Sequence, residues 1–431
     1  MSTTTVASLL EQRLRALGVG RIYGLPLGEL PHVPIADPDL AVLLADVDGR
    51  LGHHDGSGRL GAAMLSGPIL HLSSEPGGRA PLQTIGSAEE LLDALVDPPG
   101  MILPGTSALH LDLDLSAEVD EQLASSVAPD RQPVVTLDPA MADLDIVAVV
   151  GPGVVRAGAL DGLEAFSRRG GIGVVNTWGA KGVERWDSPF HFGTAGLQRR
   201  DFELAGIAAA DVVIASGLDP AESRPDQLGS YVVQEVPPRQ LGALCHRWTA
   251  SRTPPTRPPL YSALSEVVVP LYETESVPLT APRAALHLSG ALPERGIAVA
   301  DPGPAGFWIA RAFPTSFPGS VCVPAARAEG FAAAAALVCA LEGRPYVAVT
   351  DQRADGALDP TTAAIVELAE SHGQPVSLQL WGSEGRLEDV SGHVELLQRR
   401  IGGDGGHLDL VPVAVGDTDA IESVAGPIVA W

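Results

Sequence analysis

The feature that most constrains the fold of this chain is an alternation of short apolar runs and helical stretches. The run Ile146–Val150 is continuous and rich in β-branched residues, which is typical of a strand buried on both faces. A glycine turn, Gly151–Gly153, follows it directly, then a helical pattern over residues 160–169 and a second apolar run over residues 173–177. Strand, helix and strand in this order predict parallel βαβ units, so we expect an α/β fold.

The same alternation of apolar runs and helical stretches recurs before and after this central stretch. A length of 431 residues is typical of about three domains. Polar and proline-bearing segments near residues 116–133 and 250–285 separate the three stretches. We therefore predict three consecutive doubly wound, mostly parallel-sheet domains over residues 1–125, 135–270 and 283–431.

The first of these units contains two apolar runs of strand length, Leu40–Leu44 and Gly67–Leu72. Both runs are apolar enough to be buried on two faces, and we predict that both are strands of a parallel sheet. In the third unit, the alanine-rich stretch of residues 329–341 predicts a helix, and residues 346–350 predict the strand after it.

The charge balance excludes several classes of partner. Twenty-eight Lys and Arg residues against 53 Asp and Glu residues give a formal charge of −25, which repels nucleic acid and anionic membrane surfaces. The three cysteines lie far apart, so a disulfide framework or a zinc site is not expected. The N-terminus lacks the pattern of a secretory signal, and we expect a cytoplasmic protein.

Several segments resemble, in order and spacing, the thiamine diphosphate-dependent enzymes of the acetolactate synthase, pyruvate decarboxylase and benzoylformate decarboxylase type. Residues 14–28, LRALGVGRIYGLPLG, resemble the opening of that family, and Thr177–Gly182 resembles its central domain. Asp301–Gly303 and Ala328–Phe331 resemble its third domain. The resemblance implies that the three units are a shortened pyrimidine-binding domain, a central domain and a diphosphate-binding domain.

The resemblance also implies an acid that hydrogen-bonds the aminopyrimidine ring of the cofactor, and the family supplies a glutamate soon after its second strand. The acids nearest to that position here are Asp46 and Asp48, which follow Leu40–Leu44. An aspartate is one methylene shorter, and a displacement of about 1 Å can cost on the order of a hundredfold in rate. Asp46 and Asp48 are thus either catalytic acids or members of a solvated turn.

The second implied requirement is Mg²⁺, which joins the diphosphate to oxygen ligands of a Gly-Asp-Gly motif and of a later asparagine. Asp351 stands at a predicted strand end without the flanking glycines, and Asp355, followed by Gly356, lies four residues further on. Ser383 and Glu384 stand where the asparagine is expected. The candidates are therefore Asp351 and Asp355 for the metal, and Gly356 and Ser383 for the cofactor.

Two functions remain open from the sequence. The chain is either a family member with impaired or lost cofactor chemistry, which serves as a small-molecule-binding, regulatory or assembly protein, or an active thiamine diphosphate- and Mg²⁺-dependent lyase or carboligase on a 2-oxo acid. The departures at both motifs favour the first. The resemblance further implies a homodimer or a dimer of dimers.

Overall fold

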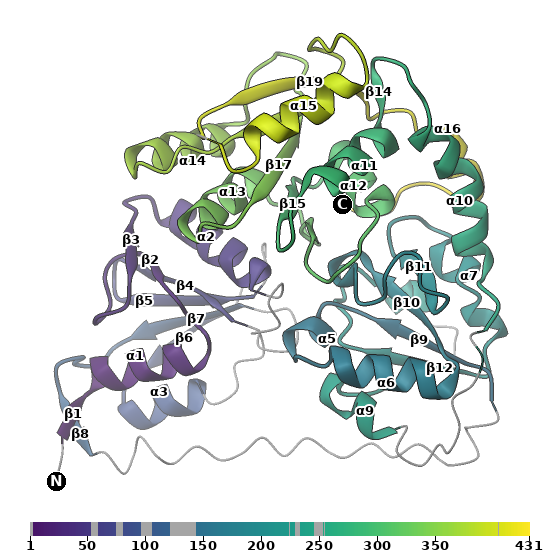
Figure 1. The fold of residues 1–431 in the computed structure, drawn as a ribbon. Helices are drawn as coiled ribbons and strands as arrows, with labels where there is room; N and C mark the ends of the chain where they lie inside the picture. The colour runs from purple at the N-terminus through teal and green to yellow at the C-terminus, as the bar shows by residue number, and fades with distance from the viewer. Residues whose placement is uncertain are drawn as a thin grey trace. The chain divides into compact units, whose positions relative to one another are not determined.

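The computed structural model describes residues 3–52, 59–74, 81–95, 106–120, 144–223, 225–228, 233–244, 253, 255–403 and 405–431 (Figure 1). The chain divides into two compact units, Met1–Val134 and Val135–Trp431. The second unit contains two sheets, and its division into a central and a C-terminal domain at residues 270–283 stays a prediction. No helix among the described residues is long and apolar enough to cross a membrane.

The first unit is built on a mixed sheet with strand order β3-β2-β4-β5-β7-β6. Helices α1 and α2 supply many of the apolar side chains that cover it. The strands are β2 (Ile22–Gly24), β3 (His32–Pro34), β4 (Gly61–Leu65), β5 (Ile69–Ser73), β6 (Leu82–Ile85) and β7 (Thr106–Leu111), the helices are α1 (Val6–Ala16), α2 (Pro38–Leu51) and α3 (Ala88–Ala94), and β1 (Thr3–Thr5) pairs with β8 (Glu118–Asp120).

The prediction of a strand over Leu40–Leu44 is wrong, because these residues form the first half of helix α2. Asp37 caps this helix by accepting the N–H groups of Asp39 and Leu40, and Pro38 occupies its first turn. Five apolar residues span less than two helical turns, so their pattern does not distinguish a buried helix from a buried strand.

The strand predicted over Gly67–Leu72 exists as β5, but its predicted parallel pairing is wrong. A tight turn over residues 66–68 joins β4 directly to β5, and the two strands pair antiparallel, as do β5 and β7. A connection this short cannot return the chain to the starting edge of the sheet, which a parallel neighbour requires.

The central sheet has the order β11-β10-β9-β12-β13, and all of its described pairings are parallel. The predicted strands at residues 146–150 and 173–177 are confirmed as β9 and β10. Helix α7 is short and ends at Leu204, two residues before Gly206, whose φ is 74°. The elements are β9 (Ile146–Val150), α5 (Gly153–Arg156), α6 (Leu160–Gly170), β10 (Gly173–Thr177), β11 (His191–Ala195), α7 (Asp201–Leu204), β12 (Val212–Ser216), α8 (Pro225–Leu228), β13 (Val233–Glu235) and α9 (Leu241–Leu244).

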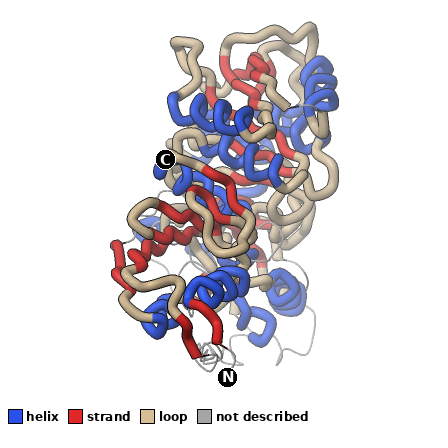
Figure 2. Tube along the Cα trace, turned by 90° about the vertical axis from the view of Figure 1, so that its left-hand side faces the viewer, coloured by secondary structure: helices blue, strands red, loops and turns tan. Residues whose placement is uncertain are grey.

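The C-terminal sheet has the order β14-β19-β18-β17-β15-β16 and is parallel throughout its described pairings. Figure 2 shows the helices that flank its strands. The elements are α10 (Pro259–Tyr272), β14 (Leu279–Thr280), α11 (Ala281–Ala291), β15 (Ile297–Ala300), α12 (Pro304–Ala312), β16 (Val321–Cys322), α13 (Phe331–Leu341), β17 (Tyr346–Asp351), α14 (Pro360–Ser371), β18 (Leu378–Gly382), α15 (Ser391–Arg400), β19 (Leu408–Ala414) and α16 (Asp419–Ala425).

Helix α13 is the alanine-rich helix expected from the sequence, and its residues from Phe331 to Cys339 are all buried. A single apolar cluster joins the central and C-terminal sheets of the second unit, since it contains Val149 and Phe192 from the central sheet and Phe307 and Val349 from the C-terminal one. The chain thus has an α/β fold with several mostly parallel sheets, as the sequence predicts.

Candidate functional site

Asp46 and Asp48 do not lie in a solvated turn, because both are buried within helix α2. The Oδ1 atom of Asp46 lies 2.7 Å from Nε2 of His71 on β5. Asp48 accepts the Tyr23 hydroxyl at 2.9 Å and pairs with Arg59 at 3.0 Å. Both carboxylates therefore hold helix α2 against the sheet of the first unit, through His71 on β5 and Tyr23 on β2.

The acid that directly follows the second strand of this sheet, β3, is Asp37. Its side chain is exposed and caps helix α2. Sequence reasoning missed Asp37 because the strand was placed at Leu40–Leu44. The available signal was the Asp-Pro pair, which is typical of a helix start.

Asp351 ends β17 at the carboxyl edge of the C-terminal sheet, where α/β folds bind ligands. Its Oδ1 accepts the N–H of Ala305, in the first turn of α12, at 2.9 Å. Its Oδ2 packs against Gly303 so closely that a Cβ there would lie 2.3 Å away. Burial raises the pKa of Asp351 to about 6. The first turn of α12 is thus capped by the protein itself, with Pro304 lacking an N–H.

Asp301 follows β15, which lies beside β17 at the same sheet edge. It is buried and accepts the N–H of Ala332 in α13 at 2.8 Å. Burial raises its pKa to about 6, and the negative charges of Asp359 and Asp351 add to the rise. Two acids that would repel each other when ionised therefore stand at this edge.

Asp355, Gly356 and Ser383 are exposed. Asp355 accepts the N–H of Ala357 at 3.1 Å and lies 3.4 Å from Nε of Arg353. Burial does not hold the side chain of Asp355 or of Ser383 in a fixed position, and Gly356 has no side chain. They are therefore less constrained than Asp351.

Gln352, which sequence reasoning missed, closes the space between the ends of β17 and β18. Its Nε2 donates to the carbonyls of Leu380 and Glu384 at 3.0 and 2.9 Å. Its Oε1 accepts the N–H of Glu384 at 2.8 Å. Both the nitrogen and the oxygen of this amide therefore hold the loop in which the resemblance implies an asparagine ligand.

The donor set at this edge differs from the Mg²⁺ site that the resemblance implies, because Ser383 and Glu384 stand where the asparagine is expected. Mg²⁺ requires near-octahedral oxygen coordination. Within the part of the chain that the structure describes, no group of three or more His, Cys, Asp or Glu side chains could hold a metal ion. Asp351 is already committed to Ala305, and Asp355 is bonded locally to Arg353 and Ala357.

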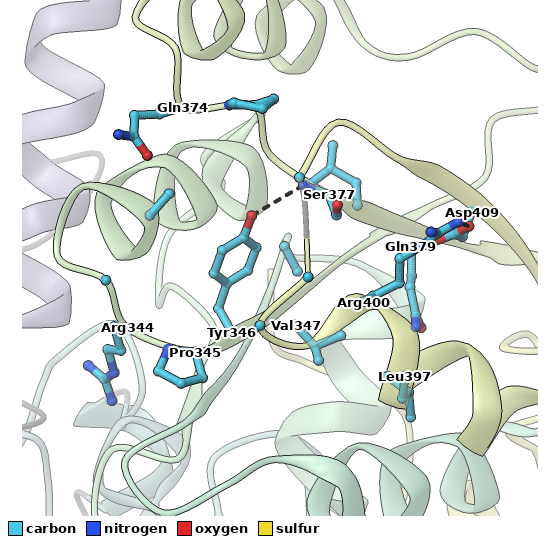
Figure 3. Close-up of a pocket in the computed structure, with 18 of the residues that line it drawn as sticks. Arg344, Pro345, Tyr346, Val347, Gln374, Ser377, Gln379, Leu397, Arg400 and Asp409 are labelled. Carbon is cyan, nitrogen blue, oxygen red and sulfur yellow. Dashed lines mark hydrogen bonds and ion pairs between the residues drawn. The ribbon is translucent and has the colours of Figure 1, made fainter.

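A cavity of about 590 Å³ lies at the opposite edge of the same sheet, where β17 and β18 begin (Figure 3). The loops before β17, β18 and β19 line it, together with the end of α15. No local sequence pattern predicts this cavity, since its polar lining residues are spread over residues 344–409.

Comparison with known proteins finds a family match for the central part of the chain. Residues 143–235 match the family "thiamine pyrophosphate enzyme, central domain". No curated protein matches the sequence. A solved structure from Mycobacterium smegmatis, provisionally described as a thiamin diphosphate-dependent enzyme, superposes with a TM-score of 0.61 and 15% identity, covering 96% of this chain and 100% of that one. The central segment is thus similar to the central domain of thiamine pyrophosphate enzymes, and nearly the whole chain shares the fold of the Mycobacterium protein.

Proposed function

We propose that this protein keeps the architecture of a thiamine diphosphate enzyme but does not bind Mg²⁺ and thiamine diphosphate in the way the resemblance implies. It serves instead as a small-molecule-binding, regulatory or assembly protein. The observation that carries this proposal is the position of Asp351, whose carboxylate is turned inward onto Gly303 and the N–H of Ala305.

A diphosphate at a helix N-terminus is held by free backbone N–H groups. At α12 the first-turn N–H of Ala305 is already taken by Asp351, and Pro304 has none to offer. A diphosphate placed here would also face Asp301 and Asp351. Both the missing donors and the like charge disfavour binding.

The acid that would assist the aminopyrimidine ring also departs from the family pattern. Asp46 and Asp48 are held by His71, Tyr23 and Arg59, and using either of them would break a buried contact. Two independent requirements thus depart from the family pattern, which supports a function other than lyase or carboligase chemistry.

Calorimetric titration of thiamine diphosphate with Mg²⁺ into the purified protein tests the proposal. We expect no binding heat and no change in melting temperature for the parent, for Asp351→Ala or for Asp355→Ala. Binding to the native state would raise the melting temperature with ligand concentration. If the parent shows submillimolar, Mg²⁺-dependent binding and one variant loses it, the proposal is wrong and the lyase alternative gains its metal ligand.

We further propose that the chain associates as a homodimer or a dimer of dimers. The support is the resemblance itself, since that family forms its site between two chains. Sedimentation at micromolar concentration that gives only a 44.5 kDa species would contradict this proposal.

A further inference from the structure

The cavity at the amino edge of the C-terminal sheet lies apart from the carboxyl edge that bears Asp351. Parallel strands begin at one edge and end at the other, so the cavity and Asp351 lie at opposite ends of β17. Its volume of about 590 Å³ is within the range of about 300 to 1,000 Å³ that is typical of small-molecule sites. The cavity is therefore a candidate ligand site of its own.

Only the accessible part of the lining can touch a ligand. Three lining residues are at most 3% exposed and lie beneath the surface: Leu378, Gln379 and Leu397. Arg344, Tyr346 and Ser377 are half-buried, so each keeps some accessible surface. The polar groups of these half-buried residues therefore decide what the cavity can recognise.

Arg344 brings a positive charge that no carboxylate neutralises among the described residues. Its Nε donates to the Arg295 carbonyl at 3.0 Å, and its Nη2 donates to the Gly319 carbonyl at 3.1 Å. Both partners are neutral, and a guanidinium stays protonated in proteins. Its Nη1 makes no hydrogen bond to the described part of the chain. Arg344 thus keeps both its charge and two N–H donors.

The other arginine of the lining is neutralised. Arg400 and Asp409 form a two-bond ion pair with both contacts at 2.8 Å. Two arginines and one aspartate are the charged side chains among the described lining residues, which leaves one positive charge. The cavity is therefore locally positive in a chain whose formal charge is −25.

Two hydroxyl groups add donors to this charge. The Tyr346 hydroxyl oxygen accepts the N–H of Ser377 at 3.2 Å, and Ser377 Oγ accepts the N–H of His407 at 3.4 Å. Neither hydroxyl donates to another described residue. Burial raises the pKa of Tyr346, so its hydroxyl stays protonated at neutral pH. Both hydroxyl hydrogens are therefore available to the acceptor atoms of a ligand.

Figure 3 shows how these groups are spread over the lining. Arg344 and the Arg400–Asp409 pair lie on either side of Tyr346 in this view, and the Tyr346 hydroxyl is directed toward Ser377. The positive charge thus stands at one end of the lining, and the hydroxyl donors stand beside its middle. A ligand that uses both groups must carry its acceptor atoms on more than one part of its surface or reach them one at a time.

The helices that end at this edge do not cancel the charge of Arg344. Helices α13, α14 and α15 end here, and the partial negative charge of a helix C-terminus resides on its unbonded carbonyls. Backbone N–H groups bond to some of these carbonyls, which reduces that charge. The bonds run from Gly343 to Ala340, from Gln374 to Ala369 and from Gly403 to Arg400, at 3.1, 2.9 and 3.2 Å.

We propose that this cavity binds a small organic carboxylate, with Arg344 as the partner of its charge and the hydroxyls of Tyr346 and Ser377 as further donors. An ionised carboxylate only accepts hydrogen bonds, which matches a lining that offers donors, and its single charge matches that of Arg344. The inference names the site and ligand class for the small-molecule function proposed above and rests on that proposal.

The test uses benzoate and benzamide as probes, because they share size and shape and differ in charge. Calorimetry and saturation-transfer NMR on the full chain should give binding of benzoate, with benzamide weaker by about tenfold or more. Equal or tighter binding of benzamide, or no binding of benzoate, overturns the proposal.

Variants of Arg344 test the charge. Arg344→Gln should weaken benzoate binding by about tenfold or more and leave benzamide binding unchanged, whereas Arg344→Lys, which keeps the charge, should retain more benzoate binding. The control is Arg353→Gln, at an arginine 52% exposed beyond the carboxyl end of β17, and it should bind benzoate as the parent does. Undiminished benzoate binding by folded Arg344→Gln overturns the proposal.

Three further variants locate the binding without changing a charge. Ala340→Phe, on the half-buried helical wall of the cavity, should abolish benzoate binding, whereas Ala357→Phe, in an exposed loop after the carboxyl end of β17, should leave it unchanged. Tyr346→Phe removes one donor and should weaken binding by about three- to tenfold. Undiminished binding by folded Ala340→Phe places benzoate elsewhere and overturns the proposal.

The same samples separate the two proposals. Titration of thiamine diphosphate with Mg²⁺ into parent and Ala340→Phe protein reports on the proposed function alone. Benzoate binding together with cofactor binding leaves the cavity site intact and removes the proposed function. Absence of both removes only the cavity site.

Discussion

The Nη2 atom of Arg311 lies 2.7 and 2.8 Å from the two carboxylate oxygens of Asp201. Arg311 is on α12 of the C-terminal layer, and Asp201 begins α7 beside the central sheet. The Nη1 atom of Arg311 also donates to the Thr194 carbonyl, and Asp201 accepts the N–H groups of Leu197 and Gln198. The side chains are 3% and 0% exposed, so this ion pair joins the two sheets of the second unit deep in its interior.

Arg311→Met should therefore destabilise the second unit by about 3 to 5 kcal/mol, because it leaves the Asp201 carboxylate buried without its partner. Arg200→Met, which breaks the exposed Arg200–Glu203 pair, should cost no more than about 1 kcal/mol. Thermal and urea unfolding of both variants measure the difference. Similar losses for the two would contradict the assigned role of Arg311.

Lys181, the only lysine of the chain, should destabilise the fold at neutral pH. Burial lowers its pKa to about 7, and the positive charge of Arg311 contributes. Its Nζ has one hydrogen bond, to the Arg311 carbonyl at 3.5 Å. Because the folded pKa lies below the unfolded one, stability should be fully present above pH 10.5 and decline as the pH falls through 7.

Lys181→Met should consequently raise the unfolding free energy at pH 7 by on the order of a few kcal/mol. It should also flatten the dependence of this free energy on pH between pH 7 and 10. Arg185→Met removes a positive charge from an exposed pair and serves as the control. A destabilised Lys181→Met protein would show instead that the amine is needed for packing or for bonding.

The buried histidine pair should make the second unit sensitive to acid. Burial lowers the pKa of His287 to about 4 and that of His393 to about 3, with the charges of Arg283 and His287, respectively, adding to the effect. The unfolded chain therefore binds more protons than the folded one below pH 6.5. The stability contribution is present above that pH and is lost as the pH falls toward 4 and 3.

His287→Gln should reduce the slope of unfolding free energy against pH between 4 and 6.5, because an amide does not titrate there. His407→Gln, on the half-buried stretch before β19, is the matched control. Chemical unfolding at several pH values gives the slopes, and an unchanged slope in His287→Gln would remove this pair as the acid-sensitive element.

The contribution of Asp351 to stability should change with pH in the opposite direction to that of the histidine pair. Since burial raises its pKa to about 6, the folded state retains a proton that the unfolded state has lost. Its contribution is full below pH 3.8 and disappears as the pH rises through 6. Asp351→Asn should flatten the dependence of unfolding free energy on pH in this range, and it keeps an acceptor for the Ala305 N–H. Asp355→Asn, at an exposed position, should leave that dependence unchanged. The variant pair is compared by unfolding between pH 4 and 7.

The sequence by itself determined the α/β class, the strands of the central sheet and the buried helix α13. Each depends on a local pattern that a single segment carries, such as the β-branched run Ile146–Val150 or the unbroken apolar stretch of α13. Such segments are buried on all sides, so their composition alone predicts their environment.

Only the tertiary structure decided whether Leu40–Leu44 is strand or helix, how β5 pairs, and what each polar residue does. The partners of these polar groups lie far along the chain: His71 is 25 residues from Asp46, Ala305 is 46 from Asp351, and Arg311 is 110 from Asp201. The cavity around Gln379 likewise arises where three separate loops meet at one sheet edge. Hydrogen bonding and burial depend on distance in space, which a local sequence pattern does not contain.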